Sequence, residues 1–389
     1  MRKAIVTIIL LFAISAVIIV EPASASDDYW VARAPIPVAM NVYGLADING
    51  QIYAFGVDDH QKALTYAYNP KTDSWTLKTP MPTSRVRFTI AQYQDKVYAI
   101  GGITGYDSSS GKSLITGTNE MYDAATDTWT TKASMPTPRT SMQANTVNGK
   151  IYVISGLVDN LAPSGPALTD VTEVYDPTNN SWTIAAPIST PVFSYASAVL
   201  DNKIYIVGGE KQAGEQSPFT TALQIYDVDN NSWSTGKSLP VLTVQAVSGA
   251  TTGVNAPKRI YVIGGRLNGP IDATQIYDPA IDEWTSGAAF PTTHDYVTEY
   301  LAAANVNDTI FTVGGIAQAN EGFYELTEQY VPAGYNGTII QPQPSTTEST
   351  SPSPSPSVAE LQWWIAPAVL LTTATLIALL TKWKRATRQ

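Results

Sequence analysis

The sequence predicts an all-β fold, a closed ring of six four-stranded blades that is called a β-propeller. Two recurring patterns predict it. An apolar run with at least one glycine in its last two places, such as KIYIVGG at residues 203–209, occurs six times, and five of the copies are followed by a Tyr with a Trp seven residues later. The repeat length of about 50 residues is that of one propeller blade.

The six apolar runs share an aromatic residue at the third place. They are residues 51–57, 96–102, 150–156, 203–209, 259–265 and 309–315. Four of them end in a double glycine: Gly101 and Gly102, Gly208 and Gly209, Gly264 and Gly265, and Gly314 and Gly315. Glycine is expected where a strand ends against another stretch of backbone.

A Trp marks the outer strand of each blade. Five of them follow the Tyr of their own repeat: Trp75, Trp129, Trp182, Trp233 and Trp284. In the sixth copy Gly337 stands seven residues after Tyr330, so the fourth strand is missing there. Trp30 precedes Pro37 by the same seven residues that separate Trp from Pro in other blades. We therefore expect an N-terminal strand, residues 29–33, to complete the sixth blade and close the ring, which removes the free sheet edges.

The combination of double glycine, Tyr and offset Trp resembles the kelch repeat, and the resemblance covers residues 30–332. It implies a six-bladed kelch-type propeller over residues 26–335. Each blade is expected to have four antiparallel strands, which in blade 4 are residues 195–200, 203–207, 222–226 and 232–235. Asn, Asp and Gly between the first two strands, as at Asp201 and Asn202, suit the positive φ angles of tight hairpins.

The N-terminal residues 1–25 have the form of a secretory signal peptide. Arg2 and Lys3 precede an apolar run, and Ala23-Ser24-Ala25 matches the small-x-small pattern that signal peptidase cuts. The alternative is an anchor helix that is not cleaved. Both interpretations predict export.

The C-terminal region predicts a membrane anchor. Residues 336–360 are rich in Pro, Ser and Thr and are expected to form an extended stalk. Residues 361–381 contain an uncharged apolar run long enough to span a bilayer, and the basic tail at 382–389 marks the cytoplasmic side. The arrangement resembles that of archaeal surface proteins, with the propeller outside the cell. The alternative is a processing signal that is removed on maturation.

The composition limits the chemistry. There is no Cys and there are only two His, which argues against a zinc site, and the glycine pairs end strands instead of opening helices, so no phosphate loop is expected. A net charge of −10 makes nucleic acid a poor partner. Asp58, Asp59 and His60 are a candidate cation cluster, but Ca²⁺ needs about six oxygen ligands and a solvated loop is the alternative. We expect no metal and no cofactor.

The loops between second and third strands share one face with the blade-to-blade connections, and they vary in length. This loop face is therefore the expected working surface, opposite a turn face of short turns. Arg85 and Arg139 stand three residues after the connection proline, where kelch proteins often carry Arg near the central pocket. The same count reaches His294, beside Asp295, and in the other blades Met40, Thr190 and Thr243.

Arg85, Arg139, His294 and Asp295 are thus candidate ligand-binding residues for an anionic or hydroxyl-rich ligand. The alternative is that each Arg fixes a loop by bonding to backbone carbonyls. N-glycosylation sequons begin at four residues, which are Asn179, Asn230, Asn307 and Asn336. Glycans there would coat the turn face, unless the sequons are chance occurrences in Asn-rich turns.

Two classes of function remain. The first is recognition of an extracellular protein or glycan by a membrane-anchored propeller. The second is a carbohydrate-active enzyme similar to a sialic acid mutarotase, a kelch-like propeller that is comparable only at the level of fold. A copper radical oxidase is excluded because it needs Cys, the Asp box of sialidases is absent, and spacing assigns no catalytic acid and base. We expect recognition, with no catalytic residues.

Overall fold

The computed structural model describes residues 27–159, 167–211, 219–267, 269, 271–291, 296–317 and 325–339. These residues form β-strands and no helix, so nothing within them has the helical length and apolar character that crossing a bilayer requires. The predicted signal peptide, the membrane helix at 361–381 and the tail at 382–389 lie outside the described residues. So do His294, Asp295 and the stalk beyond residue 339.

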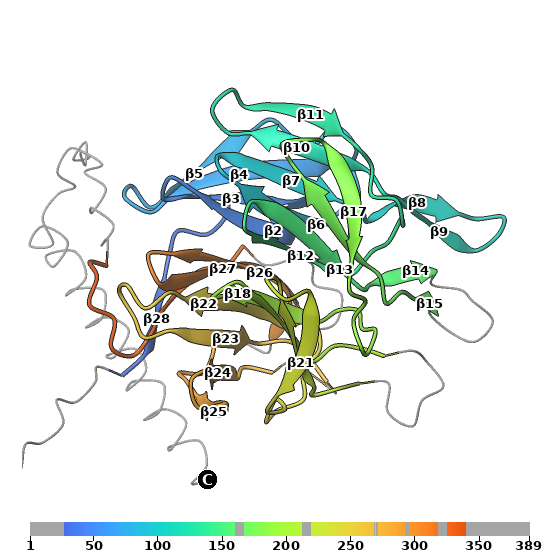
Figure 1. Cartoon of the computed structure of the whole chain (residues 1–389). Coiled ribbons are helices and arrows are strands. Elements are labelled where there is room, and N and C mark those ends of the chain that lie inside the picture. The colour runs from blue at the N-terminus through green and yellow to red at the C-terminus, as the bar shows by residue number, and fades with distance from the viewer. Residues whose placement is uncertain are drawn as a thin grey trace, which may run out of the picture. The chain divides into compact units, whose positions relative to one another are not determined.

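The strands form six four-stranded antiparallel sheets, which confirms the predicted six-bladed propeller (Figure 1). Blade 1 consists of β2 (Asn41–Ile48), β3 (Gln51–Val57), β4 (Ala63–Asn69) and β5 (Ser74–Lys78). Blade 2 consists of β6 (Thr89–Tyr93), β7 (Lys96–Ile100), β10 (Asn119–Asp123) and β11 (Thr128–Lys132). Blade 3 consists of β12 (Gln143–Val147), β13 (Lys150–Ile154), β16 (Thr172–Asp176) and β17 (Ser181–Ala185).

The second half of the ring repeats this order. Blade 4 consists of β18 (Ala196–Leu200), β19 (Lys203–Val207), β20 (Leu223–Asp227) and β21 (Ser232–Gly236). Blade 5 consists of β22 (Val247–Thr251), β23 (Arg259–Ile263), β24 (Thr274–Asp278) and β25 (Glu283–Ser286). Blade 6 consists of β26 (Tyr296–Val306), β27 (Thr309–Ala317), β28 (Thr327–Val331) and β1 (Tyr29–Ala32).

The ring closes as the sequence predicts. Strand β1 pairs antiparallel with β28, and Trp30 lies opposite Tyr330. The first strands of the blades contact one another in the order β2, β6, β12, β18, β22 and β26, and β26 contacts β2 again. The N-terminal strand therefore supplies the fourth strand of blade 6, and no blade is left with a missing strand.

The core lies between neighbouring blades. In β19 the residues Ile204, Tyr205, Ile206 and Val207 are all buried, because a blade packs against a neighbour on both of its faces. One buried cluster, for example, joins Ile154 of blade 3 to Ile206 of blade 4. This arrangement explains why the middle strands are continuously apolar instead of alternating.

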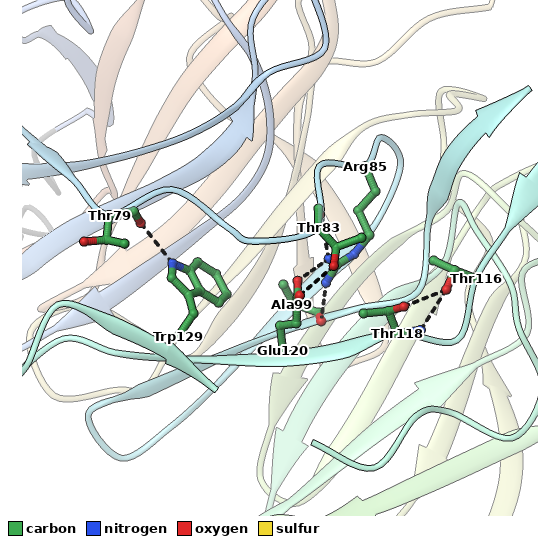
Figure 2. A network of polar contacts seen from close by, with 8 residues as sticks. All are labelled: Thr79, Thr83, Arg85, Ala99, Thr116, Thr118, Glu120 and Trp129. Atoms are coloured by element: carbon green, nitrogen blue, oxygen red, sulfur yellow. Dashed lines mark hydrogen bonds and ion pairs between the residues drawn. The ribbon is translucent and has the colours of Figure 1, made fainter. Parts of the chain in front are cut away.

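A repeated clamp joins each blade to the previous one near the turn face. In blade 2 the Asp127 carboxylate accepts hydrogen bonds from the Tyr122 hydroxyl at 2.6 Å and from the backbone N–H of Thr79 at 2.9 Å. The Trp129 indole N–H donates to the carbonyl of the same Thr79 at 2.9 Å (Figure 2). One residue of the preceding blade is thus held at both its N–H and its C=O.

The clamp occurs in all six blades. Its acceptor always stands two residues before the Trp, and the six acceptors are Asp28, Asp73, Asp127, Asn180, Asn231 and Asp282. In the closing blade Asp28 accepts from the Tyr330 hydroxyl and from the N–H of Ala288 at 2.8 Å. This Asp or Asn two residues before the Trp is a further regular feature of the repeat.

The double glycines occupy the close approach expected at the end of the second strand. Gly102 has a φ of 100°, and a Cβ atom there would lie 2.7 Å from the carbonyl oxygen of Val86. A side chain is therefore excluded by both backbone conformation and space. The glycines belong to the scaffold and place the loops that follow them.

Candidate functional site

Arg85 is buried under the loop face and bound on several sides. Only 2% of the residue is exposed. Its guanidinium donates to Glu120 at 2.5 Å, to the Thr83 carbonyl at 2.9 Å and to the Ala99 carbonyl at 2.7 Å (Figure 2). The same group lies over the ring of Phe88. These contacts tie the connection from blade 1 to the second and third strands of blade 2.

Arg139 repeats this arrangement in blade 3. The residue is 0% exposed, and its guanidinium donates to Glu173 at 2.7 Å and to the Val153 carbonyl at 2.8 Å. Burial lowers the pKa of both Arg85 and Arg139, and the negative charges of Glu120 and Glu173 offset only part of this decrease. Neither guanidinium is open to a ligand, so the geometry is that of the structural alternative, in which each Arg holds a connection in place.

In the connection into blade 4 the structure differs from the sequence prediction. The Ile188 N–H donates to the backbone carbonyl of Asp170, as the Met135 N–H does to that of Gly117, so Ser189 occupies the place of the connection proline in blade 4. The residue equivalent to Arg139 is therefore Val192, and the count to Thr190 from Pro187 was wrong by two residues. The spacing of seven residues from Trp182 already reaches Ser189.

Blades 4 and 5 hold their connections with a neutral amide. The Gln224 side chain accepts from the Thr190 N–H at 2.9 Å and donates to the Thr190 carbonyl at 3.0 Å. Gln275 makes the same two bonds with Val241, at 2.8 and 3.0 Å. Both glutamines stand where blades 2 and 3 have Glu120 and Glu173, two residues before the blade Tyr.

Blade 6 has Glu328 at this place. The residue is 8% exposed, and burial raises the pKa of its carboxyl from the ordinary 4.5 to about 7. Among the described residues no cation pairs with it. The sequence count places His294 at the Arg position of this blade, but His294 lies outside the described residues.

Sequence reasoning missed the residues that form the mouth of the central channel. Four blades place one residue of left-handed backbone there: Arg87, Ser141, Ser194 and Gln245, with φ angles of 53°, 56°, 53° and 58°. We call these four residues the collar. Backbone hydrogen bonds link the four residues in turn. The N–H of Ser141 donates to the carbonyl of Arg87 at 3.2 Å, that of Ser194 to the carbonyl of Ser141 at 2.9 Å, and that of Gln245 to the carbonyl of Ser194 at 2.9 Å. The collar stands two residues beyond the buried connection residue of each blade.

Two adjoining cavities lie along the channel. The inner one has a volume of about 290 Å³ and is lined by the first strands of the six blades, with amides and hydroxyls such as Gln92, Asn145 and Ser248. Asn145 accepts from the Ser197 hydroxyl at 3.0 Å, while its Nδ2 has no partner among the described residues. The outer cavity, of about 110 Å³, is lined by the collar and by apolar side chains of all six blades.

Charged residues stand beside the collar. Glu210 and Arg266 directly follow the double glycines of blades 4 and 5, and each bridges by backbone hydrogen bonds to the connection of its own blade. The Arg266 Nε–H donates to Gln245 at 3.0 Å. Burial raises the pKa of the Glu210 carboxyl, and the charges of Arg266 and Arg87 oppose that rise. Both guanidinium groups therefore lie near this carboxylate.

The long loops of blades 2 and 3 form additional hairpins on the loop face. Strand β8 (Ile103–Asp107) pairs with β9 (Lys112–Ile115), and β14 (Leu157–Asp159) pairs with β15 (Ala167–Leu168). The first of them projects well beyond its blade (Figure 1). Tyr106, which is 65% exposed, lies opposite Ser113 on one face of the hairpin, and Leu114, which is 50% exposed, lies on the other face.

The candidate cation cluster is a turn that its own backbone stabilises. The Asp58 carboxylate accepts from the N–H groups of His60 at 3.0 Å and Lys62 at 2.8 Å, and Asp59 lies 2.5 Å from the His60 ring. The three side chains could meet around one point, but Asp59 and His60 are exposed. The contacts are those of the solvated-loop alternative.

All four sequon asparagines are exposed. Asn179, Asn230 and Asn307 lie in the turns β16–β17, β20–β21 and β26–β27, on the turn face as expected, and Asn336 follows β28. Their glycosylation stays a prediction.

The closed ring of six four-stranded blades makes this chain a six-bladed β-propeller. A family model of the Kelch motif matches residues 84–136, 138–189 and 191–240, which cover blades 2, 3 and 4 with their incoming connections. The chain is therefore a kelch-repeat β-propeller protein, as its double glycines, Tyr and Trp indicate.

Curated relatives share the repeats over part of their length. The chain is 31% identical to Kelch-like protein 36 of Bos taurus over 231 residues, which is 59% of this chain and 36% of the bovine protein. It is 29% identical to Kelch-like protein terF of Aspergillus terreus over 57% of this chain and 48% of that protein. The chain thus spans less than half the length of these relatives.

The solved structure of YjhT is similar in fold to this chain. The two superpose with a TM-score of 0.63, covering 75% of this chain and 95% of that one, at 16% identity. At this identity the likeness shows the fold alone.

Proposed function

We propose that this protein is an extracellular recognition module, anchored in the membrane by its C-terminal helix, whose loop face binds a protein or a glycan. Kelch-repeat proteins generally bind protein partners. The export and the anchor rest on residues 1–25 and 361–389 of the sequence. The choice of the loop face as the binding surface rests on the difference between its long, variable loops and the short turns of the opposite face.

The β8–β9 hairpin is the observation that carries the proposal. A blade is complete without this hairpin, which nevertheless exposes two large apolar side chains, Tyr106 on one face and Leu114 on the other. Aromatic side chains are enriched at the centres of protein interfaces, where a ring fills a pocket of the partner. The turn face, by contrast, uses its turns for the clamps between blades.

Partner binding tests this proposal. The full chain would be immobilised and offered extracellular proteins and a glycan array, and every bound partner would be titrated against two double variants. Tyr106→Ser with Leu114→Ser removes the exposed apolar side chain from each face of the hairpin and is expected to weaken binding at least tenfold. Ile184→Ser with Val254→Ser makes the same kind of change away from the loop face and leaves binding unchanged. Equal loss in both variants contradicts the assignment of the loop face.

Protease treatment of intact cells tests the location. The propeller is expected to be cleaved or released from outside, and removal of residues 361–389 is expected to send it into the medium. A propeller that is protected in intact cells and accessible only after lysis contradicts the extracellular placement.

A further inference from the structure

We propose that the collar at the channel mouth is a binding site for a carboxylate on a short apolar carbon chain, with Arg87 as its anion-binding residue. The inference rests on the proposed function in one respect, that the loop face is the working surface. It adds a site and a ligand chemistry to that surface.

Arg87 differs from the two arginines that the sequence singles out. Arg85 and Arg139 are buried and paired with glutamates, whereas the Arg87 side chain is exposed and makes no hydrogen bond or ion pair with the described residues. The backbone hydrogen bonds of the collar fix the position of the Arg87 main chain, from which the side chain extends. A guanidinium presents paired N–H donors that match the two oxygens of a carboxylate. The Arg87 guanidinium is thus positioned by the collar and accessible to an anionic ligand.

The outer cavity has both polar and apolar lining residues. The polar collar residues Arg87, Ser141 and Ser194 are each followed by an apolar or aromatic lining residue, such as Phe88 after Arg87. A ligand that contacts both the collar and these apolar residues carries its anion directly on an apolar skeleton. A cavity of about 150 Å³ holds benzene. The 110 Å³ of the outer cavity therefore accommodates a few carbon atoms.

The charges around the collar favour a monoanion. Glu210 lies close enough to Arg87 to be affected by its charge, and the chain as a whole has a net charge of −10. Both repel a doubly charged group such as phosphate more strongly than a single carboxylate. The deeper cavity has neutral amides and hydroxyls among its apolar lining residues, and a longer apolar chain would leave these polar groups without water.

Two sources share this chemistry. One is a free branched monocarboxylic acid, and the other is the C-terminal carboxylate of a partner polypeptide that ends in a small apolar residue. Calorimetric titration of the full chain with isovalerate and with a short peptide that ends in valine distinguishes them. Isovaleramide and the C-terminally amidated peptide are the neutral controls.

Saturable binding of isovalerate, of the peptide acid or of both is expected, with no binding of the amides. Arg87→Gln is the diagnostic variant, because Gln245 already occupies the same backbone conformation in blade 5. Loss of the charged hydrogen bonds is expected to weaken binding roughly tenfold or more. Lys150→Gln removes the same charge from an exposed site at the turn face and is expected to have no effect.

Glu210→Gln gives a change of opposite sign. Removing the neighbouring carboxylate is expected to tighten binding roughly twofold to fivefold. The double variant at Tyr106 and Leu114 leaves isovalerate binding unchanged, so failure of the proposed partner surface and failure of this site can be told apart. The proposal is overturned if neither acid binds saturably, or if Arg87→Gln binds the acids as tightly as the native chain.

Discussion

Blades 2 and 3 hold their incoming connections with buried ion pairs, whereas blades 4 and 5 do the same with neutral glutamines. Glu120 and Glu173 pair with Arg85 and Arg139, and no residue contributes a charge at this place in blades 4 and 5. The backbone of the connection nevertheless has the same hydrogen bonds to the blade.

The comparison shows that charge at this place is not a requirement of the fold. Desolvation of two charges can cost as much as their attraction returns, so a buried pair is weak evidence for stability, while breaking one leaves a buried charge without a partner. The Arg and the Glu therefore depend on each other. Arg85 and Arg139, which the sequence suggests as ligand-binding residues, are therefore explained by their ion pairs with Glu120 and Glu173.

The first prediction breaks the pair in blade 3. Arg139→Val introduces the residue that blade 4 has at Val192 and leaves Glu173 buried without its cation. The free energy of unfolding is expected to fall by about 3 to 5 kcal/mol. Chemical denaturation followed by tryptophan fluorescence measures it.

Adding Glu173→Gln to this variant reproduces both residues of blade 4. Most of the lost stability is expected to return, because the amide bonds to the connection without a charge. If the double variant is as unstable as Arg139→Val alone, the loss comes from packing and the ion-pair interpretation is wrong.

The second prediction concerns Glu328 in blade 6. Its folded pKa of about 7 lies above the ordinary 4.5, so the folded protein holds the proton more tightly than the unfolded chain. The resulting stability is fully present below about pH 4.5 and is lost as the pH rises through 7. Glu328→Gln, which gives blade 6 the residue of blades 4 and 5, is expected to be about 1 to 3 kcal/mol more stable than the native chain at pH 7.5.

The measurement is the free energy of unfolding of both proteins between pH 4.5 and 7.5. The advantage of the variant is expected to shrink as the pH falls, because the native carboxyl is then neutral too. A constant difference across this range would show that Glu328 does not titrate in it.

The third prediction tests the clamp that all blades share. Asp28→Ala removes the acceptor of the Ala288 N–H and the Tyr330 hydroxyl in the closing blade. The cost is expected to be about 1 to 3 kcal/mol, the penalty for leaving partly buried donors without partners. Hydrogen exchange of β1 and β28 locates the loss at the closure.

Asp27→Ala is the matched control, because Asp27 is exposed and takes no part in the clamp. It is expected to change stability by less than about 0.5 kcal/mol. The clamp would have no special role at the closure if Asp28→Ala left exchange in β1 and β28 unchanged.

The sequence by itself determined the number of blades and the way the ring closes. The residues responsible repeat at fixed spacing and act within one blade or between adjacent blades, so their pattern can be recognised in the sequence alone. Trp30 was identified as the closing residue from its distance to Pro37 alone, and β1 pairs with β28 accordingly. Asp28 carries an equally regular signal, two residues before that Trp.

Only the tertiary structure decided which polar side chains are available to a ligand. The partner of Arg85 is Glu120, 35 residues away, and that of Arg139 is Glu173, 34 residues away, so nothing local shows that these guanidinium groups are buried. The collar residues come from four blades and meet only where the ring closes around its axis. Repetition fixes the scaffold, whereas the chemistry of the channel mouth depends on side chains that differ from blade to blade.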